Sequence, residues 1–259
     1  QTKPCCRVKI KRLEENRMNE RTKNVIEGIE NRRLELDDIL PFSCTHCGSC
    51  CVHQEELLLN PLDLFRVAKE LGITVEQWLK QYGECYIGEN SRMPIVRIRP
   101  QGETRRCPLL KNNKCSVHKT KPSVCGLYPL GRTIRYVMDE QGKPDMEKSE
   151  VIYFHSGCFC GSQTGHQTVR EWLEEFHLLE SETFFIQWSQ VLMETSMFLR
   201  RLEKAVTNQD IMNVAWSMVC ALLYVRYDTG KEFRIQFDRN VQELRKHIAA
   251  IENMGGAVS

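Results

Sequence analysis

The chain has 259 residues, which is enough for one large domain or two small ones with a core that needs no disulfides. Its net charge of +2 favours no class of partner, and its 13 cysteines remain available for chemistry. No stretch of about 18 apolar residues is present, and residues 1–12 carry too many charges for a signal peptide, so we expect a cytoplasmic protein with reduced thiols and no membrane association.

The first 40 residues are dense in charges of both signs, and their apolar residues are few and poorly periodic. This composition predicts a charged N-terminal arm or a partly exposed helix over residues 1–40. Cys5 and Cys6 lie in this arm without a further thiol nearby in the sequence, so we interpret them as bystanders.

Two short helices are predicted to follow the first cysteine run. Asn60 and Pro61 have the order of a helix cap and a first-turn proline, and Asp63 is a favourable charge near the positive helix end. Thr74 followed by Gln77 has the spacing of a capping box and begins a second helix. Glycines end both helices.

The middle of the chain predicts short strands and turns instead of a deep sheet. Apolar residues alternate imperfectly with arginines over residues 95–100, and the closing proline is typical of an edge strand. Residues 109–117 predict a hairpin that turns over two consecutive asparagines. Residues 133–138 and 151–154 predict a second strand pair.

The C-terminal part has a different pattern. Thr168 followed by Glu171 again has capping-box spacing, and apolar and aromatic residues recur at helical intervals between residues 172 and 202. Further helices are predicted over residues 208–227 and 238–251. These aromatic residues are expected to form ordinary core.

Together these elements predict an α+β fold, with a small loop- and hairpin-rich cysteine-cluster region and a C-terminal helical bundle. The expected organisation is a charged arm or helix over residues 1–40, a cysteine-cluster metal-binding domain over residues 41–165, and the helical bundle over residues 166–259.

Seven cysteines form an ordered framework, in which four thiols follow one another as CxxCxxCC and three more follow about sixty residues later. They are Cys44, Cys47, Cys50, Cys51, Cys107, Cys115 and Cys125. Neither an apolar core nor a hairpin needs four thiols in eight residues, so this spacing predicts a soft metal ion or an iron-sulfur cluster. Cys85 and Cys220 lie outside the framework, and we interpret them as a bystander and a buried small hydrophobe.

The first cysteine run has the spacing that bacterial ferredoxins use for three corners of a [4Fe-4S] cluster, and Gly48 allows the left-handed turn that points amides toward sulfur. In an extended chain Cys50 and Cys51 would point to opposite sides, so Cys51 is expected to serve a second site, to bridge, or to stay free. At least one of Cys158 and Cys160 is expected to be a metal ligand together with the seven framework cysteines. Eight sulfurs would fill two four-thiolate sites.

The predicted cofactor is one or two [4Fe-4S] clusters, and zinc is the alternative. Zinc ions would staple a loop-rich region, but zinc sites usually separate their CxxC pairs by longer loops. A mononuclear or mixed iron site is the third alternative. His46, His53, His118 and His155 are possible histidine ligands. His118 and Tyr128 are the first candidates for a hydrogen-bond donor near a ligating sulfur, which would change the reduction potential or acidity of the site.

A basic stretch overlaps the framework, because residues 92–135 contain eleven Lys or Arg and a single acid, Glu103. Such cations would favour deprotonated thiols and balance an anionic cluster. They would also suit a nucleic-acid surface, or form an ordinary solvated face. The solvated face is the default interpretation.

Three segments resemble one known family: FSCTHCGSCC at 42–51, CPLLKNNKCSVH at 107–118 and KPSVCGLYP at 121–129. They are similar to the cysteine-cluster proteins with a CxxCxxCC signature, the YkgJ-like family described as zinc- or iron-chelating, over about residues 42–175. The resemblance implies metal chelation by the seven framework cysteines. The same region resembles flagellin lysine N-methylases, which implies an iron-sulfur cluster coupled to S-adenosylmethionine chemistry.

The expected function is therefore metal binding with a redox or protein-modification role, acting on a protein substrate or a redox partner. An enzyme of this kind would be a cluster-dependent, S-adenosylmethionine-using protein methyltransferase or an oxidoreductase. The chain has neither the glycine-rich signature of ordinary methyltransferases nor the CxxxCxxC of radical enzymes. A structural zinc module that contacts protein or nucleic acid is the alternative, with nucleic acid the less favoured partner.

Overall fold

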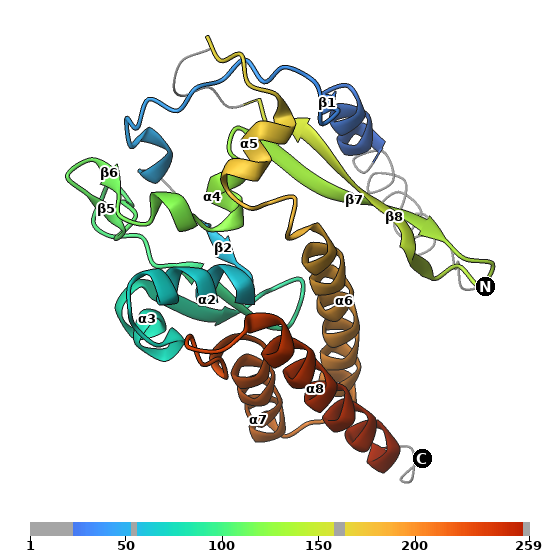
Figure 1. The fold of residues 1–259 in the computed structure, drawn as a ribbon. Coiled ribbons are helices and arrows are strands. Elements are labelled where there is room, and N and C mark those ends of the chain that lie inside the picture. The colour runs from blue at the N-terminus through green and yellow to red at the C-terminus, as the bar shows by residue number, and fades with distance from the viewer. Residues whose placement is uncertain (1–22, 53–55, 158–163, 256–259) are drawn as a thin grey trace, which may run out of the picture.

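The computed structural model describes residues 23–52, 56–157 and 164–255. Five residues considered above lie outside this part of the chain: Cys5, Cys6, His53, Cys158 and Cys160. The described residues form helices and three small antiparallel sheets, which confirms the α+β class (Figure 1). No helix among them is long and apolar enough to span a bilayer.

The largest sheet has the strand order β1-β8-β7 and contains the predicted pair from the middle of the chain. Its strands are β1 (Arg33–Leu34), β7 (Leu130–Met138) and β8 (Pro144–His155), so the pair is longer than predicted. Helix α5 (Val169–Glu175) lies beside this sheet (Figure 1). Side chains from the sheet, α5 and the adjoining loops form one apolar cluster: Leu40, Phe42, Leu127, Leu130, Tyr153, Val169, Trp172, Leu173, Phe176 and Leu178.

The second sheet has the order β2-β4-β3, with β2 (Leu58–Leu59), β3 (Gly83–Ile87) and β4 (Pro94–Ile98). The prediction that residues 95–100 form an edge strand is wrong, because β4 is the central strand. Pro100 lies beyond the last paired residue, so it removes no backbone donor from the ladder and both edges of β4 can pair.

Helices α2 (Pro61–Glu70) and α3 (Val75–Tyr82) cover this sheet and begin at the predicted caps. In both helices the cap side chain, Asn60 or Thr74, accepts a hydrogen bond from the backbone N–H three residues later. The side chain of that later residue accepts from the backbone N–H of the cap. These reciprocal bonds satisfy backbone donors that a helix start otherwise leaves unpaired.

The C-terminal helices are α6 (Glu182–Ala205), α7 (Gln209–Cys220) and α8 (Phe233–Gly255). Helix α7 continues into a π-helical turn, η3 (Ala221–Val225). Helix α8 begins at Phe233, earlier than the predicted start at 238.

One apolar core joins these C-terminal helices to α2, α3 and the β2-β4-β3 sheet. Its fully buried side chains include Leu64, Trp78, Phe198, Leu199, Leu222 and Phe237. The same core contains Cys107, Leu109 and Val117 from the cysteine region. The cysteine region therefore rests directly on the core that the C-terminal helices help to form.

Candidate metal centre

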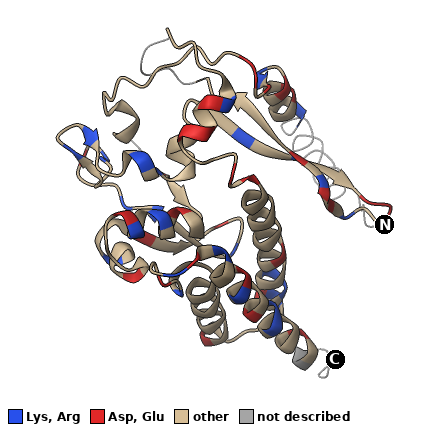
Figure 2. Ribbon diagram, viewed as in Figure 1, with Lys and Arg blue, Asp and Glu red and all other residues tan. Residues whose placement is uncertain are grey.

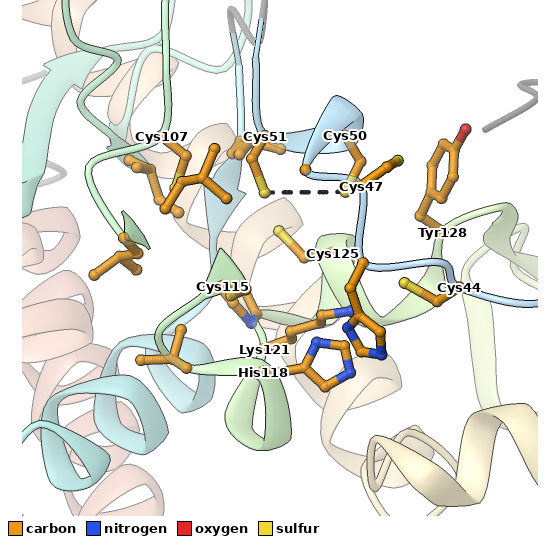
Figure 3. Close-up of a pocket in the computed structure, with 18 of the residues that line it drawn as sticks. Cys44, Cys47, Cys50, Cys51, Cys107, Cys115, His118, Lys121, Cys125 and Tyr128 are labelled. Atoms are coloured by element: carbon orange, nitrogen blue, oxygen red, sulfur yellow. Dashed lines mark hydrogen bonds between the residues drawn. The ribbon is translucent and has the colours of Figure 1, made fainter. Parts of the chain in front are cut away.

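The framework cysteines lie on three separate segments that meet above the core (Figure 3). The first run lies in a loop that contains the 3-10 turn η1 (Ser49–Cys51), preceded by Gly48 with a φ of 73°. The second segment is a hairpin of β5 (Leu110–Lys111) and β6 (Lys114–Cys115), and the third is the short helix α4 (Ser123–Leu127).

The hairpin confirms its prediction and places two of the thiols. Asn112 and Asn113 at the turn have positive φ values of 50° and 60°, as a tight two-residue hairpin turn requires. Cys107 enters the hairpin, and its backbone N–H donates to the carbonyl of Cys51 at 2.8 Å. This bond joins the first cysteine run to the second segment.

Asp63 fixes helix α4, a role that the sequence pattern did not reveal. Its Oδ1 accepts hydrogen bonds from both the backbone N–H and the hydroxyl of Ser123, each at 2.7 Å. Asp63 is only 2% exposed, and burial raises the pKa of its carboxyl while the bonds from Ser123 act against that shift. The start of α2 is thereby joined to the turn that presents Cys125.

All seven framework thiols line one cavity of about 160 Å³ (Figure 3). Four further side chains of interest line the same cavity: His46, His118, Lys121 and Tyr128. The convergence of residues about sixty positions apart in the sequence is the arrangement that the cysteine spacing predicts.

Five of the seven thiols form an inner group in which each thiol interacts electrostatically with at least one of the others. This inner group consists of Cys50, Cys51, Cys107, Cys115 and Cys125. Cys44 is close enough to raise the pKa of Cys115. Cys47 is exposed, and its sulfur lies 3.2 Å from the hydroxyl of Ser49, which places it at the rim.

The adjacent cysteines of the CxxCxxCC run point together, with their sulfurs 3.9 Å apart. The expectation that Cys50 and Cys51 diverge is wrong, because both lie in the 3-10 turn η1 and not in extended chain. A hydrogen bond from the Cys51 thiol lowers the pKa of Cys50, and the Lys121 cation lowers it further. The same contact, together with burial, raises the pKa of Cys51.

Burial raises the pKa values of the three downstream thiols, Cys107, Cys115 and Cys125. Backbone N–H groups act in the opposite direction: those of Leu109 and Leu110 approach the Cys107 sulfur, and that of Val117 approaches the Cys115 sulfur. Protonated thiols must release their protons to bind a metal, and N–H groups aimed at sulfur stabilise the thiolates that result.

Lys121, from the basic stretch, lines the thiol cavity. It is 9% exposed, and its Nζ lies 4.8 Å from the ring centroid of Phe176. Its charge lowers the pKa values of Cys50 and Cys115.

Other basic residues of the stretch pair with carboxylates elsewhere. Arg92 pairs with Glu203, Arg97 with Glu84, and Arg135 with Glu150. Figure 2 accordingly shows blue and red segments interspersed over several elements.

His118 lies inside the cavity as a neutral side chain at physiological pH. Burial, and then the charges of Lys121 and His46, lower the pKa of His118 to about 4. Its ring centroid is 4.6 Å from that of His46. Tyr128 lines the same cavity, whereas His155 at the end of β8 bonds through Nδ1 to the backbone N–H of Gly157.

Cys85 and Cys220 form a separate pair, with sulfurs 3.6 Å apart. Cys85 is exposed on β3, and Cys220 is half-buried at the end of α7. Neither residue lines the thiol cavity. Of the histidine, cysteine, aspartate and glutamate side chains that the structure describes, no three or more are arranged to hold a single metal ion.

Comparison with known proteins identifies this region. Residues 43–158 match the family model described as "CxxCxxCC: Putative zinc- or iron-chelating domain". Over these residues the chain is similar to the CxxCxxCC family. The resemblance noted in the sequence is confirmed, and the CxxCxxCC match includes the loop, the hairpin and helix α4 that carry the framework thiols.

One archaeal relative is similar over a length comparable to that of the CxxCxxCC match. An alignment with the uncharacterized protein MJ0661 of Methanocaldococcus jannaschii is 27% identical over 112 residues. It covers 41% of this chain and 56% of MJ0661, so the chain spans about half the length of that relative. No solved structure matches the chain.

Proposed function

We propose that the CxxCxxCC region holds an iron-sulfur cluster of the [4Fe-4S] type between its framework thiols. The observation that carries this proposal is the cavity of about 160 Å³ that the seven thiols line. A structural zinc ion binds four ligands, and a volume of about 10–15 Å³ by this measure already holds one water. The cavity therefore has more thiols and more space than one ion needs.

Zinc and a cluster differ in the sulfur spacing that they require. Thiolates on one tetrahedral zinc, each about 2.3 Å from the metal, lie about 3.8 Å from one another. A cluster places several irons and sulfides between its thiolates, so it spans sulfurs that are farther apart.

The surroundings of the thiols suit an anionic cluster. Lys121 supplies a positive charge within the cavity, and the N–H groups of Leu109, Leu110 and Val117 are directed toward ligand sulfurs. Net charge and hydrogen bonds to sulfur are the factors by which a protein sets the reduction potential of a cluster. When bound, such a cluster accepts and donates electrons.

The role that follows is redox chemistry, either as electron exchange with a protein partner or in support of modifying a protein substrate. In this role Lys121 would balance the negative charge of the centre, and the neutral His118 would be a hydrogen-bond donor beside it. Two centres would require thiols beyond the inner group, for which Cys44 and Cys47 at the cavity are the described candidates.

Zinc remains the second candidate because of one contact. The sulfurs of Cys50 and Cys51 are 3.9 Å apart, which is close to the separation of two thiolates on one zinc ion. A zinc ion on this pair would need two more ligands from the inner group. The domain would then have a structural role in binding protein or nucleic acid.

Metal analysis after anaerobic purification tests the proposed function. We expect a coloured protein with broad charge-transfer absorption, and about four irons and four sulfides per chain for each cluster. Stoichiometric zinc in a colourless protein would support the zinc module and reject the cluster.

Replacing Lys121 by methionine tests the electrostatic part of the proposal. We expect the reduction potential of Lys121→Met to become more negative, because a buried positive charge stabilises the reduced, more negative state of the cluster. Lys119→Met is the matched control, since Lys119 is exposed in the neighbouring 3-10 turn η2 (His118–Thr120). Equal potentials for the two variants in a redox titration would contradict this role of Lys121.

A further inference from the structure

A second cavity lies on the other side of helix α4 from the thiols. It has a volume of about 880 Å³, within the range of about 300–1,000 Å³ that is usual for small-molecule sites. Helix α6 and strands β2, β4 and β7 supply most of its wall. Val124 of α4 lines both this cavity and the thiol cavity.

The wall of this second cavity is mainly apolar. Helix α6 contributes Trp188, Leu192, Met193 and Met197, and β4 contributes Ile95. Methionine side chains are flexible and polarizable, so they adapt to the shape of an apolar ligand. A ligand that fills this space would need an apolar or aromatic body.

Arg132 of β7 supplies a charged group at this apolar wall. Its guanidinium carbon lies 3.8 Å from the ring centroid of Phe185, which also lines the cavity. Its Nη1 is buried and has no hydrogen-bond partner among the described residues. A buried donor without an acceptor is costly, and a ligand oxygen would remove that cost.

The charges around Arg132 select the kind of anion. Asp63 and Glu182 both interact electrostatically with Arg132. Tyr153 hydrogen-bonds to Arg132, and its hydroxyl donates to Glu182. A doubly charged phosphate at Arg132 would face this additional negative charge. A carboxylate carries a single charge and matches the planar donor edge of a guanidinium.

We propose that the cavity between α6 and β7 binds a small monocarboxylate with an apolar or aromatic body, whose carboxylate bonds to Arg132. The ligand body lies against Trp188, Met193 and Met197, and helix α4 separates it from the thiols. This site is independent of which metal the thiols hold, so its test can fail without affecting the proposed metal centre.

Binding of 4-phenylbutyrate and of its neutral amide, 4-phenylbutyramide, to the purified full chain tests the site. Isothermal titration is expected to show binding of the acid tighter than about 1 mM and at least about tenfold weaker binding of the amide. Arg132→Gln should weaken binding of the acid by about tenfold or more and leave the amide unchanged. The matched control is Arg135→Gln, an exposed arginine on the same strand, which should bind both probes as the original chain does.

A second variant keeps the test decisive if Arg132→Gln does not fold. Met193→Trp fills the cavity from α6 without removing Arg132, and it should weaken both probes by about tenfold or more. The proposal is overturned if the acid binds no tighter than about 1 mM, if acid and amide bind equally, or if Met193→Trp binds both probes unchanged.

Discussion

Cys125→Ser is expected to lose at least about nine-tenths of the bound metal, while Cys220→Ser keeps all of it. Loss of a side chain that merely orients a metal ligand often costs about 10- to 100-fold in affinity, so loss of a ligand should cost at least as much. Cys125 lies within the inner group of thiols, where Cys107, Cys115 and Cys50 raise its pKa in addition to burial. Serine has nearly the same size but cannot supply a thiolate at neutral pH.

Cys220 is the matched control because it is also a half-buried helical cysteine with another thiol close by, at 3.6 Å. Iron, sulfide and zinc content per folded chain is the measurement, with circular dichroism to establish folding. Cys47→Ser should fall between the two variants, since its exposed sulfur lies at the rim of the cavity. Equal metal content in Cys125→Ser and Cys220→Ser would reject the inner group as the ligand set.

Asp63→Ala is expected to lower the free energy of unfolding by about 2–4 kcal/mol. The change leaves the N–H and hydroxyl of Ser123 buried without their acceptor and removes half of the capping box at the start of α2. Asp63→Asn keeps an acceptor oxygen for Ser123 and should lose less than half as much. Urea unfolding of the metal-free chain measures the difference.

Glu76→Ala provides the control for Asp63→Ala. Glu76 is also an acid in a first helical turn, but its side chain is 66% exposed and its ion pair with Lys80 is solvated. Its replacement should change the free energy of unfolding by no more than about 0.5 kcal/mol. If Asp63→Ala lowered the free energy of unfolding by no more than about 0.5 kcal/mol, the Asp63–Ser123 bonds would not be what holds α4 in place.

Features governed by neighbouring residues were predictable from the sequence. The helix caps at Asn60, Thr74 and Thr168 depend on a residue three positions away, and all three form reciprocal bonds. The hairpin over Asn112 and Asn113 follows in the same way from residues that tolerate a positive φ. The convergence of the framework thiols was predictable because a soft metal centre needs thiols at so dense a spacing, whereas a core or a hairpin does not.

Features that depend on distant partners were not predictable. β4 became a central strand because β2 and β3 pair on either side of it, which its own residues do not specify. The early start of α8 was missed for a local reason: the carboxylate of Glu232 accepts from the N–H of Ile235, but glutamate is not among the usual cap residues. The sequence near Asp63 predicts only a favourable charge at the start of a helix. The contact with Ser123 depends on the tertiary fold.

The 55 residues between Cys51 and Cys107 include α2, α3 and the β2-β4-β3 sheet, which share their core with the C-terminal helices. A metal ion or cluster that is coordinated by both Cys51 and Cys107 would also restrain the helices and strands between them. By thermodynamic linkage, metal binding at the cysteines would stabilise the packing of α6, α7 and α8. A loss of that packing would in turn lower the affinity for metal. A substitution in the core of those helices would then lower the affinity for metal without changing any metal ligand.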